Sequence, residues 1–137
     1  MSEITKIVEQ MRNQREGIIE MLSTVSKEDM TLPAKYGKLD VDIRYRFYRF
    51  IAHEVEHTLQ ISKTLFDLNV FPSEARQILQ KMIQTRGELE GILINLEDED
   101  LDKKPAPDQW SIRETLDHII QVETAYTASI SSAMQNQ

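Results

Sequence analysis

The chain has 137 residues, a formal net charge of −7 from 16 basic and 23 acidic side chains, no cysteine and three histidines. The lack of cysteine excludes disulfides, thiolate metal sites and thiol nucleophiles. The acidic balance argues against a nucleic-acid partner, because binding to phosphate backbones depends on clustered Lys and Arg. Four glycines and four prolines, about half the usual share, favour long helices over a turn-rich β-sandwich.

The start of the chain, Met1–Lys6, lacks the basic and apolar regions of a targeting segment. No uninterrupted apolar run exceeds three residues, so we expect no membrane-spanning helix. The sequence therefore predicts a cytoplasmic protein with no membrane partner, folded as a single domain over residues 1–137.

Four segments place apolar residues at three- and four-residue spacings and so predict α-helices. Ser73 is the expected N-cap of the third helix, and Ser111 with Glu114 has the spacing of a capping box at the fourth. The expected helices cover about residues 4–22, 40–68, 73–96 and 112–130. No segment alternates long enough to indicate a strand. The sequence predicts an all-α, single-domain four-helix bundle.

The two halves of the chain resemble each other. Met11, Arg15 and Leu22 recur at the same spacing as Met82, Arg86 and Leu93. This repeat predicts pseudo-two-fold halves, each with a long linker (about residues 23–40 and 97–110) that allows a crossover connection. Seven extra residues in the first linker would bring His53 opposite His118. Similar amphipathic helices without a true repeat are the alternative explanation.

Charged residues inside the apolar stripes indicate where ion pairs form. Glu123 interrupts the stripe of the last helix, where an unpaired carboxylate is costly. Arg15 and Arg86 interrupt the other stripes and are its candidate partners. The mixed basic and aromatic run 44–49 is interpreted as a solvated or anion-contacting face, and Trp110 as closing one end of the core.

The histidines offer several metal sites. His53 and His57 lie four residues apart on one helical face and can bind one metal ion. The string HEVEH also fits a zinc protease with Glu54 as base, but no strand is expected to hold a peptide. The second E-x-x-H pair that a di-iron bundle requires is missing around His118. A mononuclear site of His53, His57 and His118 remains, against the alternative of three unrelated histidines.

Two segments resemble the DinB-like family. Residues 53–61 read HEVEHTLQI and are similar to its H-x-x-x-H-x-x-Q-I helix. Residues 110–119 read WSIRETLDHI and are similar to its W-S-x-x-E-x-x-x-H helix. The family commonly has the tryptophan-serine helix first, whereas here the order is reversed, and Leu59 replaces a small residue before the glutamine.

The resemblance implies a four-helix bundle with one divalent metal ion, usually zinc or nickel, held by His53, His57 and His118. Among relatives are metal-dependent hydrolases and S-transferases that use a low-molecular-weight thiol as co-substrate. The resemblance therefore implies a metal-dependent enzyme acting on a small-molecule substrate, with Glu54 or Glu56 as a base or as a partner that orients an imidazole. The alternative is a non-catalytic bundle that binds a metal or small molecule. Exposed stripe edges would also allow a homodimer.

Overall fold

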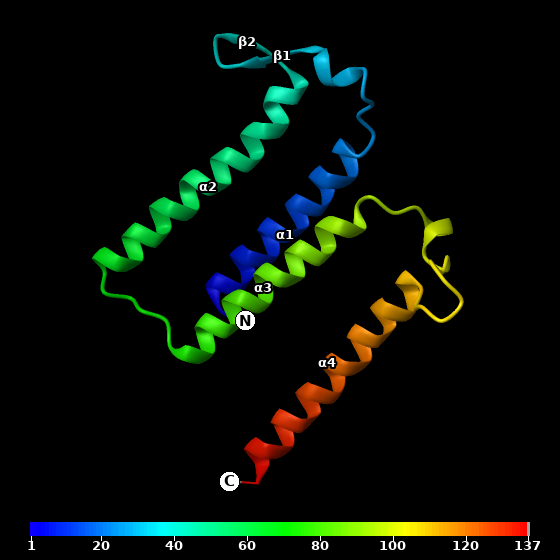
Figure 1. Cartoon of the computed structure of the whole chain (residues 1–137). Helices are drawn as coiled ribbons and strands as arrows, with labels where there is room; N and C mark the ends of the chain where they lie inside the picture. The colour runs from blue at the N-terminus through cyan, green and yellow to red at the C-terminus, as the bar shows by residue number, and fades with distance from the viewer. Residues whose placement is uncertain (137) are drawn as a thin grey trace. The chain divides into compact units, whose positions relative to one another are not determined.

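A computed structural model describes residues 1–136, which form four α-helices, two 3₁₀ turns and one two-stranded β-sheet (Figure 1). The chain divides into two compact units, Met1–Phe71 and Pro72–Gln137, which are described in turn. The all-α class predicted from the sequence is confirmed. Among the described residues, no helix is both long and apolar enough to cross a lipid bilayer.

The first unit holds two long helices, α1 (Glu3–Leu22) and α2 (Ile43–Asp67), which run in opposite directions (Figure 1). Each begins at a side-chain cap that satisfies a free backbone N–H. The Ser2 hydroxyl accepts from the backbone N–H of Thr5, and the Asp42 carboxylate accepts from that of Tyr45 at 2.7 Å.

A β-hairpin occupies part of the linker between these helices, which the sequence did not predict. Strands β1 (Pro33–Tyr36) and β2 (Leu39–Asp42) pair antiparallel after the 3₁₀ turn η1 (Asp29–Thr31). Gly37 opens the two-residue turn with φ +59°, as a type II′ turn requires. The expected start of the helix near Asp40 was therefore wrong, because residues 39–42 pair with β1. Strands of four residues are too short to show a clear alternation.

The far end of α2 is closed by a Schellman motif. Asn69 takes the left-handed conformation, φ +55°. The N–H of Val70 donates to the carbonyl of Leu65 at 2.9 Å, and the N–H of Asn69 donates to that of Phe66 at 3.0 Å. This bond pattern satisfies carbonyls that the helix leaves free. The turn expected at Asn69 and Pro72 is confirmed.

The second unit repeats the plan with α3 (Glu74–Leu93), the 3₁₀ turn η2 (Asp98–Asp100) and α4 (Ile112–Gln135). The capping box of Ser111 and Glu114 is present, with the hydroxyl accepting at 3.1 Å and the carboxylate at 2.7 Å. The linker returns to the start of α4, where Arg113 donates to Asp102 at 2.6 Å. The third helix ends three residues before the expected Leu96.

Matching ion pairs join the two helices within each unit. Arg15 of α1 pairs with Glu54 of α2, and Arg86 of α3 pairs with Glu123 of α4 at 2.6 Å. Each arginine is the thirteenth residue of its helix, and each glutamate is the twelfth of its helix. The internal repeat is therefore visible in the contacts, and Arg86 is the partner of Glu123 among the two candidates.

The helix register differs from the one expected for the histidines. Counted from the helix starts, His53 of α2 corresponds to Val122 of α4, whereas His118 corresponds to Arg49. The expected alignment of His53 with His118 was wrong because α2 begins after a hairpin that the sequence did not reveal.

Residues 53–88 are all exposed, and burial among the described residues is highest around the start of α4. Ser111, at 3% exposure, is the one residue among 1–136 that is buried. Half-buried apolar residues follow it on α4, namely Ile112, Leu116, Ile119 and Val122. Trp110, expected to close the end of the core, is 55% exposed.

Candidate functional site

His53 and His57 lie next to each other on one face of α2, as their four-residue spacing predicts. Their Nε2 atoms are 3.1 Å apart, and the ring centroids are separated by 4.4 Å at an interplanar angle of 78°. The two Nε2 atoms therefore lie within hydrogen-bond distance of each other on one face of α2.

Gln60 fixes the orientation of His57. The Nδ1 atom of His57 lies 2.8 Å from Oε1 of Gln60. An amide oxygen accepts but cannot donate, so Nδ1 carries the hydrogen in this contact. The Nε2 atom of a neutral His57 then presents its lone pair toward His53, which is the form that binds a metal.

The spacing of the two nitrogens fits a shared metal ion. Two imidazole nitrogens at about 2.0–2.1 Å from a tetrahedral zinc are separated by roughly 3.3 Å, close to the observed 3.1 Å. Among residues 1–136, no group of three or more His, Asp or Glu side chains gathers to complete such a site. The first unit therefore brings together two side chains that could serve as metal ligands.

A cavity of about 620 Å³ lies beside the histidine pair in the first unit. Its size falls within the usual range for small-molecule sites, about 300–1,000 Å³. The wall combines three arginines with apolar and hydroxyl-bearing side chains. The lining residues are Met11, Gln14, Arg15, Tyr36, Arg46, Arg49, Phe50, His53, Glu54, His57, Thr58 and Ile61.

The two glutamates proposed as bases occupy different positions. Glu54 lines the cavity and is held by Arg15. Glu56 does not line it, and its carboxylate accepts from Arg49 at 3.2 and 3.3 Å. The hydrogen bond from Arg49 lowers the pKa of Glu56, and the same contact raises the pKa of Arg49. Glu56 is therefore a weaker base than an ordinary glutamate, and it lies outside the lining of the cavity.

His118 lies on α4 in the second unit. Its ring meets Trp110 edge to face, with centroids 4.9 Å apart and an interplanar angle of 71°. The indole sits directly before the Ser111 cap, so the capping box sets the position of the ring that contacts His118. This contact restricts the rotation of the imidazole, which is exposed to solvent.

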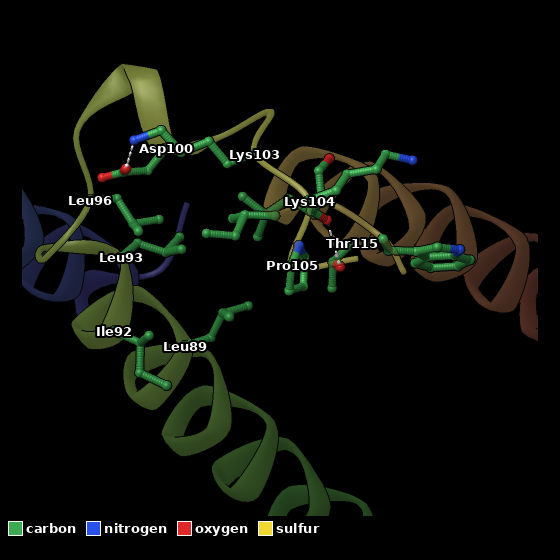
Figure 2. A pocket seen from close by; sticks show the side chains of 13 residues that line it. Leu89, Ile92, Leu93, Leu96, Asp100, Lys103, Lys104, Pro105 and Thr115 are labelled. Atoms are coloured by element: carbon green, nitrogen blue, oxygen red, sulfur yellow. Dashed lines mark hydrogen bonds and ion pairs between the residues drawn. The ribbon is translucent and has the colours of Figure 1, made fainter. Parts of the chain in front are cut away.

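The second unit has a cavity of its own, of about 590 Å³, at the end where α3, the linker and α4 meet. Figure 2 shows Leu89, Leu93 and Leu96 on one side of it and Pro105 with Thr115 on another. Lys103 and Lys104 reach it from the linker but are paired, with Asp100 at 2.6 Å and Glu114 at 2.8 Å. No histidine lines this cavity.

Two features of this site were not identified from the sequence: Tyr36 in the cavity wall and the orienting role of Gln60. Arg46 and Arg49 lie over the ring of Tyr36, with Cζ 5.2 and 5.5 Å from its centroid. The aromatic and basic run 44–49 was the signal for this face. Tyr36 could not be added to it because the β-hairpin that carries it was not predicted.

The comparisons with known proteins support the resemblance. A family model described as the DinB superfamily matches residues 81–136. The matched segment includes the second half of α3 and the tryptophan-serine motif with His118 on α4. No curated protein and no solved structure matches the chain. The match supports the DinB-like resemblance over residues 81–136, and the helix with His53 and His57 lies outside the matched segment.

Proposed function

We propose that this member of the DinB superfamily is a divalent-metal-dependent enzyme, acting as a hydrolase or as a thiol-dependent S-transferase. His53 and His57 are the ligands from the first unit, and zinc or nickel is the expected ion. His118 is the proposed third ligand, on the strength of the family resemblance. The observation that carries the proposal is the convergence of the two Nε2 atoms at 3.1 Å.

The side chains around the pair are suited to this role. Gln60 holds the tautomer of His57 that leaves Nε2 free to bind a metal. Imidazole suits both zinc and nickel, and a catalytic zinc site commonly has three protein ligands and one open position. When bound, such an ion lowers the pKa of a water or a thiol and so supplies a nucleophile near neutral pH.

Glu54 is the proposed proton acceptor for this reaction. It shares the cavity with both histidines, and Arg15 fixes its carboxylate from the neighbouring helix. A carboxylate so held keeps one orientation toward the cavity, which a general base needs. Glu56 is proposed only as a charge that orients Arg49, because Arg49 lowers its pKa.

Metal analysis tests the proposal directly. The chelator-treated protein is reconstituted with zinc or nickel, and the metal content and affinity are measured for the wild type, His57→Ala and His118→Ala. We expect about one metal ion per chain in the wild type and a loss of more than about 100-fold in affinity for each variant, since removing an outer partner alone costs 10–100-fold.

The outcomes separate the alternatives. A metal content that is well below one per chain, and unchanged by His57→Ala, contradicts the metal site. If His57→Ala loses the metal but His118→Ala does not, the ligand set is wrong while the histidine pair stands.

The loaded protein is then incubated with a panel of thiols, electrophiles and esters. Turnover that needs the thiol identifies an S-transferase, and turnover without it identifies a hydrolase. A loaded protein that binds these compounds but turns over none is a non-catalytic binding bundle.

A further inference from the structure

The three arginines of the first cavity are not equivalent in charge. Arg15 is paired with Glu54, and Arg49 is paired with Glu56. Arg46 has no carboxylate within 4.0 Å among residues 1–136. One positive charge therefore remains uncompensated in this cavity, although the whole chain carries a net charge of −7.

Arg46 is held in place without being neutralised. Its guanidinium lies over the ring of Tyr36 at 5.2 Å, and the edge of that ring packs against Tyr45, with centroids 5.7 Å apart. Stacking on an aromatic face fixes the plane of a guanidinium and leaves its N–H groups free for hydrogen bonds at the edge. A planar donor fork held in this way is matched by a planar acceptor.

The other residues of the cavity wall indicate the chemistry of the rest of the ligand. Met11, Phe50 and Ile61 line the same cavity and offer apolar surface. The Arg15 and Arg49 charges are matched by their glutamates, so a dianion would keep one charge uncompensated. A single free guanidinium binds a monoanion, and carboxylate is the monoanion that accepts its two parallel hydrogen bonds.

From this arrangement we propose that the first cavity binds an organic carboxylate with an apolar body, whose carboxylate is held by Arg46. The inference deepens the proposed function by naming the substrate class of that site, and it rests on that function. Arg46 is a binding residue in this assignment, which separates it from the histidines and from Glu54. The apolar body lies toward Phe50 and Ile61, and the carboxylate lies toward Tyr36.

Binding measurements on the metal-free, full-length protein test the inference apart from catalysis. The probes are 4-phenylbutyrate, its neutral amide and the corresponding phosphate monoester, titrated by calorimetry. We expect the carboxylate to bind at least about tenfold more tightly than the amide, because a bidentate contact to a guanidinium is charge-assisted. The phosphate ester is expected to bind no more tightly than the carboxylate.

Variants of two neighbouring arginines supply the control. Arg46→Gln is expected to reduce the preference for the carboxylate to less than about threefold, and Arg46→Lys to retain part of it, since lysine keeps the charge without the fork. Arg44→Gln removes the same charge from the same helix, but Arg44 does not line the cavity. This control is expected to leave the preference unchanged. Circular dichroism checks that each variant is folded.

The inference is overturned if the amide binds as well as the carboxylate or if no carboxylate binding is seen at about 10 mM. It is also overturned if the preference survives Arg46→Gln or if the phosphate ester binds more than about tenfold more tightly. Zinc binding measured on Arg46→Gln keeps the two proposals distinct. A carboxylate preference in a protein that binds no metal contradicts the proposed function alone, whereas normal zinc binding without that preference contradicts the carboxylate site alone.

Discussion

The two units share one helical plan and differ in what it carries. Each joins its helices by an arginine at the thirteenth position of the first and a glutamate at the twelfth position of the second. The eleventh and fifteenth positions of the second helix are His53 and His57 in the first unit, but Val122 and Tyr126 in the second. The ion pair is therefore common to both units, whereas a pair of imidazoles occupies these positions in the first unit and not in the second.

The cavities of the two units follow the same division. The first contains arginines, a tyrosine and two histidines, and the second is lined mainly by leucines, isoleucines and a proline. Charges at the second cavity are paired within the linker and its helix, as Lys104 is with Glu114. The repeated pair of helices thus carries a polar cavity in the first unit and a mainly apolar cavity in the second.

Among the changes that compare the two units, the largest effect is expected from the residue that orients His57. Gln60 is the eighteenth residue of α2, and Ser129 holds that position in α4. Gln60→Ala removes the acceptor of the His57 Nδ1 hydrogen. Loss of such an outer partner commonly costs 10–100-fold in metal affinity, so we expect zinc affinity, measured by competition with a chromophoric chelator, to fall by about that factor.

Ser129→Ala is the matched control, because it truncates the counterpart position in the unit that lacks the histidine pair. Its zinc affinity is expected to stay within about threefold of the wild type, well inside the 10–100-fold effect of an outer partner. Equal losses in both variants would mean that the two units do not differ in the way the histidine positions indicate.

A smaller effect is expected from the caps. Ser111 in the second unit is 3% exposed and accepts from the N–H of Glu114 at 3.1 Å, whereas the Ser2 cap of the first unit is exposed. Ser111→Ala leaves a part-buried N–H without its partner. We expect it to lower the free energy of unfolding by about 1–2 kcal/mol, measured by urea denaturation.

Ser2→Ala makes the same chemical change at a cap where water can replace the lost oxygen. We expect it to cost less than about 0.5 kcal/mol, the low end of the range for caps. If the two variants were destabilised to the same extent, the difference in burial between the two caps would have no energetic meaning.

Local patterns allowed much of the helical structure to be predicted. Apolar spacing gave the four helices, and Ser111 with Glu114 gave a helix start to the residue. The charge within the α4 stripe also predicted that Glu123 pairs with an arginine, because a carboxylate on an apolar face is costly without one. These features depend on residues that are close in sequence or on a single repeated position.

Features that depend on chain reversal could not be predicted in the same way. Tyr36 and Arg46 meet because a four-residue strand turns at Gly37 and pairs with the next. The hairpin also shifts the start of α2, which is why His53 was aligned with the wrong residue of α4. The proposed metal ligands are a different case. The four-residue spacing predicted that His53 and His57 share a face, and their nitrogens converge, whereas the contribution of His118 stays a prediction.

The smallest effect is expected in the pH dependence of stability, to which the linker of the second unit contributes. Lys104, which donates to Glu114, and the backbone N–H of Ser111 lower the pKa of Glu114, and Arg113 lowers the pKa of Asp102. Tyr45 holds the position of Glu114 in the first unit and has no carboxylate. We therefore expect acid to destabilise the chain partly through these two carboxylates, beside Glu56, Asp29 and Asp100, whose pKa values are also lowered.

The direction of this pH effect follows from the difference in proton binding between the folded and the unfolded chain. A carboxylate whose pKa is lowered in the folded state binds fewer protons there than in the unfolded chain. Its stabilising contribution is complete above the ordinary carboxyl pKa of about 4 and is lost as the pH falls through the lower, folded value. We expect Tm to fall between pH 7 and pH 3.

Lys104→Gln should make that fall smaller, because it removes the largest cause of the Glu114 shift. Lys81→Gln removes a lysine of α3 that forms no ion pair in the described residues, and it should leave the fall unchanged. An equal flattening in both variants would show that overall charge, rather than the contact at the cap of α4, sets the response to acid.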